Sequence, residues 1–198
     1  MLIKLKNDSI LSCSFKMDQF KTAIKDDDID KALELKQEFD LDLKHALFDA
    51  IRDDEEFAMS LIDASDRIDL PLSEANEDNQ TPLLLACGLE KPKVALAILK
   101  KGKSHDIAIN TKDGYGRTPF LWACKNGWTT IVAKMLEEAS DFELDLNTKD
   151  NCEMTGFILA CGEKRSEVVD ILMAEAEDID LQAKDVNDKS GFDYLTTR

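Results

Sequence analysis

The sequence TPFLWAC at residues 118–124 has two counterparts elsewhere in the chain, and all three align without gaps. Residues 81–87 read TPLLLAC and residues 155–161 read TGFILAC, so the leading threonines stand 37 residues apart. Self-similarity at one fixed period is typical of proteins built from stacked structural repeats.

Each copy has the local signals of a helix pair. The Thr suits an N-cap position, and the following Pro suits the first helical position, where its missing N–H costs nothing. Thirteen residues after each Thr a second apolar run begins, at residues 94–99, 131–136 and 168–173. Between the two runs, polar residues and Gly, such as Lys125-Asn126-Gly127, break the helix. The spacing predicts a helix, a tight turn and a second helix.

A polar stretch precedes each Thr, at residues 76–80, 113–117 and 150–154. We expect these stretches to form an extended hairpin that leads into the next unit. One such unit cannot bury its own apolar face, so the units must stack on one another. A fourth copy begins at residue 190 and has room for about two helical turns before Arg198.

This pattern resembles the ankyrin repeat, whose hallmark is Asp-x-x-Gly-x-Thr-Pro-Leu-His-x-Ala followed by a Gly turn and a second helix. The best copy matches it at Asp113, Gly116, Thr118, Pro119 and Ala123. The resemblance implies an all-α solenoid of stacked helix-turn-helix units with projecting β-hairpin loops.

Three departures from the family pattern are visible. The copy at residues 150–161 has Glu153 in place of Gly and Gly156 in place of Pro. Apolar residues replace the family's His in all three copies, which implies an apolar tie between neighbouring loops; they are Leu84, Leu121 and Ile158. The period of 37 exceeds the usual ~33, and the extra residues fall at 103–107 and 141–144.

Weaker copies lie upstream. Residues 45–63 and 18–35 each give two apolar helical faces separated by an acidic turn, with Leu33 on the second face of the earlier copy. We therefore expect seven segments: an N-terminal extension (1–17), an irregular N-terminal capping repeat (18–43), ankyrin repeats at 44–75, 76–112, 113–149 and 150–184, and a truncated repeat or cap (185–198).

The net charge of −16 is uneven, with 21 acids against 10 bases in residues 1–80 and 20 against 15 in residues 81–198. A field of this sign repels phosphate backbones and anionic lipid, so we expect neither a nucleic acid nor a membrane as partner. A protein with a basic surface is the better candidate. The alternative is that the acidity only maintains solubility.

The chain has no apolar run near the ~18 residues of a membrane span, and its start lacks the features of a secretory signal. Five cysteines without tight spacing fit a reducing compartment, so we expect the protein in the cytoplasm or nucleus. We also expect a monomer. Cys87, Cys124 and Cys161 occupy equivalent places in successive units, too far apart to share a metal, and we expect them in the core. We predict no metal and no cofactor.

Catalytic patterns are missing as well. His45 and His105 belong to no recognisable triad, and Gly114-Tyr115-Gly116 lacks the Lys of a phosphate-binding loop. We therefore predict that the chain is not an enzyme and has no small-molecule substrate.

The resemblance implies a binding surface on the concave face, made of hairpin tips and first-helix ends. The residues that match it are Asp78, Gln80, Tyr115, Arg117, Lys125, Asn126, Trp128, Cys152, Met154, Glu163, Asn187 and Lys189. Trp128 is either a partner anchor or packs on a neighbouring turn. Phe120, Phe157 and Trp122 are assigned to the core.

Two acidic turns form a second candidate, an acidic docking patch of Asp26, Asp27, Asp28, Asp53, Asp54, Glu55 and Glu56. Three interpretations remain open: solvated turns placed near helix N-termini, a docking patch for a basic partner, or a cation site.

The sequence therefore predicts a protein–protein interaction module that acts as an adaptor or scaffold. An inhibitor or effector of the partner is one version of this role. The alternative is a structural spacer, or a fragment of a larger ankyrin-repeat protein whose functional site lies outside this chain.

Overall fold

The computed structural model describes residues 15–141, 143–175 and 178–196. The chain divides into two compact units, Met1–Leu72 and Ser73–Arg198, and each is described by itself. In the described part, no helix combines the length and the apolar character needed to cross a membrane.

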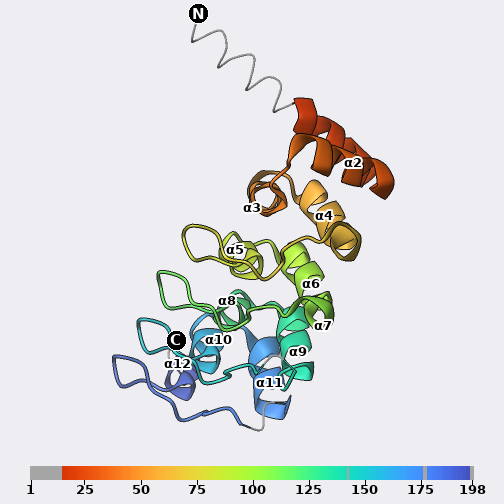
Figure 1. The fold of residues 1–198 in the computed structure, drawn as a ribbon. Helices are drawn as coiled ribbons and strands as arrows, with labels where there is room; N and C mark the ends of the chain where they lie inside the picture. The colour runs from red at the N-terminus through yellow and green to blue at the C-terminus, as the bar shows by residue number, and fades with distance from the viewer. Residues whose placement is uncertain (1–14, 142, 176–177, 197–198) are drawn as a thin grey trace, which may run out of the picture. The chain divides into compact units, whose positions relative to one another are not determined.

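In the described part of the first unit, from residue 15 onward, four segments are helical (Figure 1). Residues 15–25 are helical, including residues 15–17 of the predicted extension. They are followed by α2 (Ile29–Phe39), α3 (Leu43–Asp53) and α4 (Glu55–Ile68). Phe20 and Phe57 are buried and meet edge to face with ring centroids 6.4 Å apart. The two predicted helix pairs are confirmed here.

One upstream assignment is wrong. Leu33, placed on the apolar face of its helix, is 38% exposed, whereas Ala32 and Leu35 are buried. Adjacent residues on a helix point about 100° away from each other around its axis. Leu33 therefore lies outside the narrow buried face of α2 that holds Ala32 and Leu35.

The second unit consists of stacked helix pairs (Figure 1). The first helices are α5 (Pro82–Gly88), α8 (Pro119–Asn126) and α10 (Gly156–Gly162), and α12 (Gly191–Thr196) continues this layer. The second helices are α6 (Pro92–Lys100), α9 (Thr129–Glu137) and α11 (Ser166–Glu175). Each helix packs on its equivalent in the next repeat, α5 on α8 and α6 on α9 among others.

The helix starts follow the sequence signals. Thr81, Thr118 and Thr155 are N-caps whose side chains accept the N–H three residues later, at 3.2, 3.3 and 3.3 Å. Pro82 and Pro119 occupy the first helical position. A short helix that the repeat pattern does not predict, α7 (Gly102–His105), follows α6 where the extra residues of this repeat fall.

The core of the second unit lies between the two helix layers. Cys87, Cys124 and Cys161 are buried in it, as predicted, together with Phe120 and Phe157. The residues that replace the family's His are also buried: Leu84, Leu121 and Ile158.

Asparagine side chains connect successive repeats on the loop after each second helix. Asn110 donates to the carbonyl of Glu143 at 2.8 Å and accepts from the N–H of Asp145 at 3.2 Å. Asn147 makes the same pair of bonds with Asp178 and Asp180 one repeat later, at 2.8 and 2.7 Å. Both ends of each amide are therefore used to hold neighbouring loops in register.

Candidate functional site

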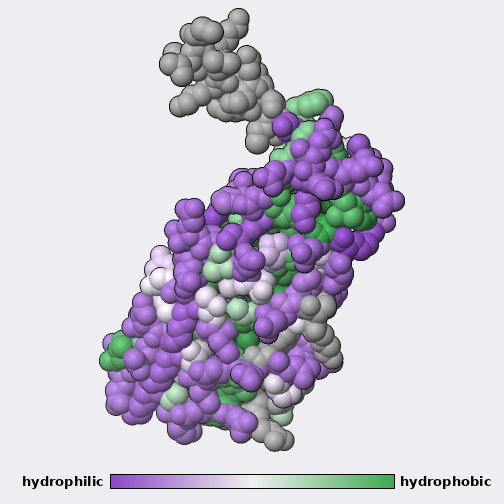
Figure 2. Space-filling view, viewed as in Figure 1, coloured by the Kyte–Doolittle hydropathy of each residue, from purple (hydrophilic) through white to green (hydrophobic). Residues whose placement is uncertain are grey.

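Four loops project along one edge of the second unit, at residues 76–80, 113–117, 150–154 and 185–189 (Figure 1). Each is headed by a side chain that accepts the backbone N–H groups two and four residues later, and these are Asn76, Asp113, Asp150 and Asp185. A backbone hydrogen bond between the first and fifth residues closes each loop. The loops are thus tight side-chain-stabilised turns. Figure 2 shows that this edge is largely hydrophilic.

The fourth residue of every loop has a left-handed backbone. Gly116 takes φ 75°, and Asn79, Glu153 and Asp188 take φ 58°, 58° and 60° at the equivalent position. Gly adopts this conformation without strain, which explains the family's preference for it. The chain departs from the family at Glu153 but keeps the backbone shape.

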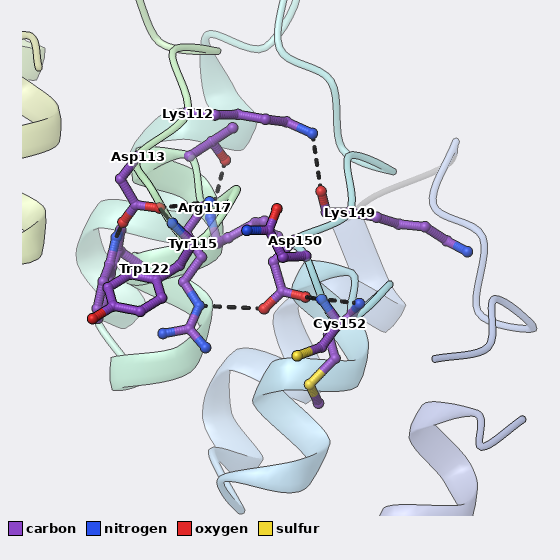
Figure 3. Close-up of polar contacts among 12 residues, drawn as sticks. Lys112, Asp113, Tyr115, Arg117, Trp122, Lys149, Asp150 and Cys152 are labelled. Carbon is purple, nitrogen blue, oxygen red and sulfur yellow. Dashed lines mark hydrogen bonds and ion pairs between the residues drawn. The ribbon is translucent and has the colours of Figure 1, made fainter. Parts of the chain in front are cut away.

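Neighbouring loops bond directly to one another. Asn151 donates its backbone N–H to the carbonyl of Tyr115 at 2.9 Å and its side-chain amide to the carbonyl of Gly114 at 3.0 Å. Lys112 donates to the carbonyl of Lys149 at 2.9 Å (Figure 3). Nζ of Lys149 in turn donates to the carbonyl of Lys184 at 3.2 Å. Loops tied in this way form a preorganised surface.

Trp122 lies beneath the loop at residues 113–117. It is buried, as predicted, at 9% exposed, but its indole Nε1 donates a 2.8 Å hydrogen bond to Oδ2 of Asp113. The guanidinium of Arg117 lies 5.0 Å from the ring centroid of Trp122 and 5.8 Å from that of Tyr115, and Nζ of Lys125 lies 5.2 Å from Trp122. We call these five residues the loop cluster. Its two cations are held on aromatic faces.

The loop cluster includes two residues that are not among the predicted site residues, Asp113 and Trp122. A signal for them is present in the sequence, because the same construction recurs at Asp185 and Tyr194, also nine residues apart. The Tyr194 hydroxyl donates to Asp185 at 2.6 Å, and Lys189 lies 5.3 Å from the Tyr194 ring.

An ion pair ties the loop cluster to the next loop. Nε of Arg117 lies 3.3 Å from Oδ2 of Asp150, whose side chain is only 2% exposed (Figure 3). Oδ1 of Asp150 accepts the backbone N–H groups of Cys152 and Met154. Both oxygens of the buried Asp150 carboxylate therefore have hydrogen-bond partners within the protein.

Hydrogen bonding also sets the charge state of the last loop. Burial raises the pKa of Asp185, but hydrogen bonds from the Tyr194 hydroxyl and from the amides of Lys189 and Asn187 outweigh it and lower the pKa to about 2. The same Tyr194–Asp185 bond raises the pKa of Tyr194. At neutral pH Asp185 is therefore a carboxylate that accepts a hydrogen bond from the protonated Tyr194 hydroxyl.

The remaining predicted concave residues divide among the loops and helix ends. Those on loops are Asp78, Gln80, Cys152, Met154, Asn187 and Lys189, and of these Gln80 and Met154 are half-buried and the rest exposed. Asn126 ends α8, and its Nδ2 is buried without a hydrogen-bond partner among the described residues. Glu163 is the exposed C-cap of α10.

Trp128 lies in different surroundings from the loop cluster. It is the half-buried N-cap of α9 and lines a shallow groove with Pro92 and Leu96 of α6 and Ile131 of α9. No residue of the projecting loops lines that groove. Tyr115, at 68% exposed, is the aromatic residue that the loops present.

The acidic docking patch belongs to the first unit. Asp28 and Asp54 are N-caps of α2 and α4, and Glu55 and Glu56 lie in the first turn of α4. Basic residues pair with several of the acids: Arg67 with Asp27 at 2.7 Å, Lys25 with Glu56 at 2.9 Å and Lys21 with Asp54 at 3.7 Å. The remaining acids of the patch, Asp26 and Asp53, are exposed.

The electrostatics of the patch follow from these contacts. The hydrogen bond from the N–H of Phe57 lowers the pKa of Asp54, with smaller contributions from Lys25 and Lys21. The bond to Glu56 raises the pKa of Lys25. Part of the acidity therefore caps helices and forms ion pairs within the unit.

Within the described ranges, no three His, Cys, Asp or Glu side chains are grouped so that they can hold a metal ion. Burial raises the pKa of the Cys87 and Cys124 thiols, and raises that of Cys161 to about 11. These three thiols are neutral at physiological pH and are poor nucleophiles.

A family model described as ankyrin repeats (3 copies) matches residues 103–185. The match spans α8 to α11, two of the four loops in full, and all five residues of the loop cluster. No curated protein matches the chain.

Proposed function

We propose that this chain, which contains ankyrin repeats matched over residues 103–185, binds another protein through its concave face and hairpin tips. Ankyrin repeats are generally protein–protein interaction modules. The fold supplies a preformed surface, so little free energy is lost in ordering it on binding.

The observation that supports the proposal best is the exposure of Tyr115 above a rigid base. An exposed Tyr on an ordered loop is the kind of side chain that contributes most to protein interfaces. Its backbone carbonyl is bonded to Asn151, and its neighbour Arg117 is fixed by Asp150. We propose that the partner covers Tyr115 and contacts the rest of the predicted concave set around it.

The acidic docking patch is a second proposed contact, for a basic part of the partner. Its exposed acids, Asp26 and Asp53 among them, would act mainly by steering association. Replacing Asp53, Asp54, Glu55 and Glu56 with Asn or Gln should slow association and flatten its salt dependence. Unchanged association would leave the patch a solubility and capping feature.

Trp128 is a proposed anchor on the α6–α9 groove rather than in the loop cluster. If a partner fills this groove, Trp128→Ala speeds dissociation, at a cost of ~2 kcal/mol for a hot spot. A Trp128→Ala protein that binds normally but unfolds at lower temperature would assign the ring to packing instead.

Affinity capture tests the proposed function. The full chain is immobilised, and proteins captured from a lysate of the source cells are quantified by mass spectrometry for wild type, Tyr115→Ala and Met173→Ala. Met173 is the matched control because it is also exposed, at 51%, but lies on α11. We expect at least one protein to be captured by wild type and by Met173→Ala and to fall about tenfold with Tyr115→Ala.

A partner with this pattern would fit an adaptor, scaffold or inhibitor. Capture that is equal for all three proteins, or missing for all three, would favour the spacer alternative. Ankyrin-repeat proteins are typically non-enzymatic, and no catalytic role is proposed.

A further inference from the structure

We propose that the loop cluster binds an acidic, extended segment of the partner, whose carboxylates pair with Lys125 and Arg117. This inference rests on the proposed function and adds the chemical class of the segment. It differs from the expectation of a partner with a basic surface, because the loop cluster presents two cations, Arg117 and Lys125, although the chain as a whole has a net charge of −16.

Asp113 and Asp150, the acids that head the loops at residues 113–117 and 150–154, are directed inward. Asp113 accepts the N–H groups of Tyr115 and Arg117 on one oxygen and the indole of Trp122 on the other. Asp150 accepts hydrogen bonds from two backbone N–H groups and from Nε of Arg117, and its side chain is 2% exposed. A partner that approaches the loops therefore meets little of either carboxylate.

Both cations are partly exposed, with Lys125 half-buried and the Arg117 side chain 19% exposed. Among the described residues, no carboxylate lies within ion-pair distance of Lys125, whose ammonium instead lies on the ring of Trp122. Arg117 uses its Nε for Asp150, and its two terminal nitrogens are drawn pointing away from that carboxylate in Figure 3. Two terminal N–H groups on one edge of a guanidinium match a carboxylate in a bidentate pair.

The rings make the cations better binding groups. A guanidinium held by Trp122, Tyr115 and Asp150 has already lost most of its conformational freedom, so less entropy is lost when a carboxylate binds. The ring faces also shield the cations on one side, which strengthens charge pairing on the other.

A second cation on an aromatic ring extends the surface. Lys189 occupies the loop position equivalent to Arg117 and lies over Tyr194, which is held by Asp185. The intervening loop has Met154 at this position, half-buried and uncharged. At this position an extended segment that crosses the three loops would therefore meet a cation, an apolar side chain and a cation in turn. The exposed carboxylates of Glu153 and Asp188 on the same loops pair with Lys149 and Lys184, at 3.0 and 2.8 Å.

Peptide display tests the inference. A library of random 12-residue peptides is selected on the immobilised full chain, and the affinity of the selected peptides is measured by fluorescence anisotropy. We expect the selected sequences to be enriched in Asp and Glu. Lys125→Gln should weaken the strongest peptide roughly fivefold, Lys125→Arg should retain the binding, and Lys100→Gln should have no effect. Lys100 is the matched control because it is exposed at the end of α6.

The outcomes separate this inference from the proposed function. Neutral or basic peptides that lose affinity with Tyr115→Ala but not with Lys125→Gln would overturn the acidic segment and leave concave-face binding in place. Peptides that ignore both substitutions would overturn both. A selection that yields no binding peptide would also overturn the acidic segment.

Discussion

A Cβ atom added to Gly156 would lie 2.8 Å from Cε1 of Phe120, the residue that packs against it from the preceding repeat, and 3.0 Å from Sγ of Cys124. Gly191 stands in the same relation to Phe157, at 2.5 Å. In the repeat before these, the position of Phe120 is occupied by Leu83, and the next repeat begins with Pro119. Gly in place of the family's Pro thus accompanies the larger Phe side chain.

Gly156→Ala should therefore destabilise the protein by ~1–3 kcal/mol through overpacking, although Ala is the better helix former. Phe120→Leu in the same chain should recover a large part of that loss, which a double-mutant cycle from urea unfolding would measure. Gly88→Ala is the control, because no atom lies within 4 Å of its added Cβ. Equal stability of Gly156→Ala and wild type would contradict the packing account.

The Arg117–Asp150 ion pair should matter for stability. Asp150→Ala leaves two loop amides and the Arg117 Nε without their acceptor, and we expect a loss of about 2–3 kcal/mol. Asp78→Ala, at an exposed loop position, should change stability by less than ~0.5 kcal/mol. The free energies of unfolding in urea would compare the two, and a similar effect of both substitutions would rule out a special role for the buried carboxylate.

The cysteines should fall into two classes in thiol labelling. Cys87, Cys124 and Cys161 are buried with raised pKa values and should react only as the protein unfolds, whereas the exposed Cys152 should react at once. A Cys13→Ser/Cys152→Ser variant should show no fast phase with a disulfide reagent. Metal analysis should find no stoichiometric zinc, and one tightly held zinc per chain would overturn the core assignment.

The Tyr194–Asp185 bond should give a pH-dependent contribution to stability. The pKa of Asp185, about 2, lies below the ~3.9 of an unfolded chain, so the carboxylate stabilises the fold above about pH 4 and this stabilisation is lost as the pH falls toward 2. Tyr194→Phe should cost ~1–2 kcal/mol at pH 7 and progressively less below pH 4.

Tyr115→Phe is the control for that measurement, because the Tyr115 side chain is exposed. Urea unfolding of both variants at pH 7 and pH 3 would test the prediction. A cost of Tyr194→Phe that is the same at both pH values would show that its hydroxyl does not act through the Asp185 carboxylate.

The helices and core of the second unit could be predicted from the sequence because their signals are local. An N-cap Thr, a Pro at the first helical position and apolar residues at helical spacing act within a few residues of each other. The same spacing wrongly predicts that Leu33 is buried. The width of the buried face of a helix depends on which neighbouring elements cover it.

The loop cluster could be predicted only in part. Tyr115, Arg117 and Lys125 follow from the family pattern, but the bond between Asp113 and Trp122 depends on the loop folding back over its own helix. The helical spacing of Trp122 predicts a core residue. Spacing alone does not show that one edge of a buried ring reaches a polar loop. The groove around Trp128 is also a tertiary feature, since α6 and α9 come from different repeats.

Hydrogen–deuterium exchange of the captured complex tests the central claim most directly, because it locates the partner on the chain. With partner bound, we expect slower exchange at residues 113–117 and 150–154 and at the indole N–H of Trp122, with α11 unchanged. Protection confined to the second helices α6, α9 and α11, with the loops exchanging as in the free protein, would contradict binding through the concave face.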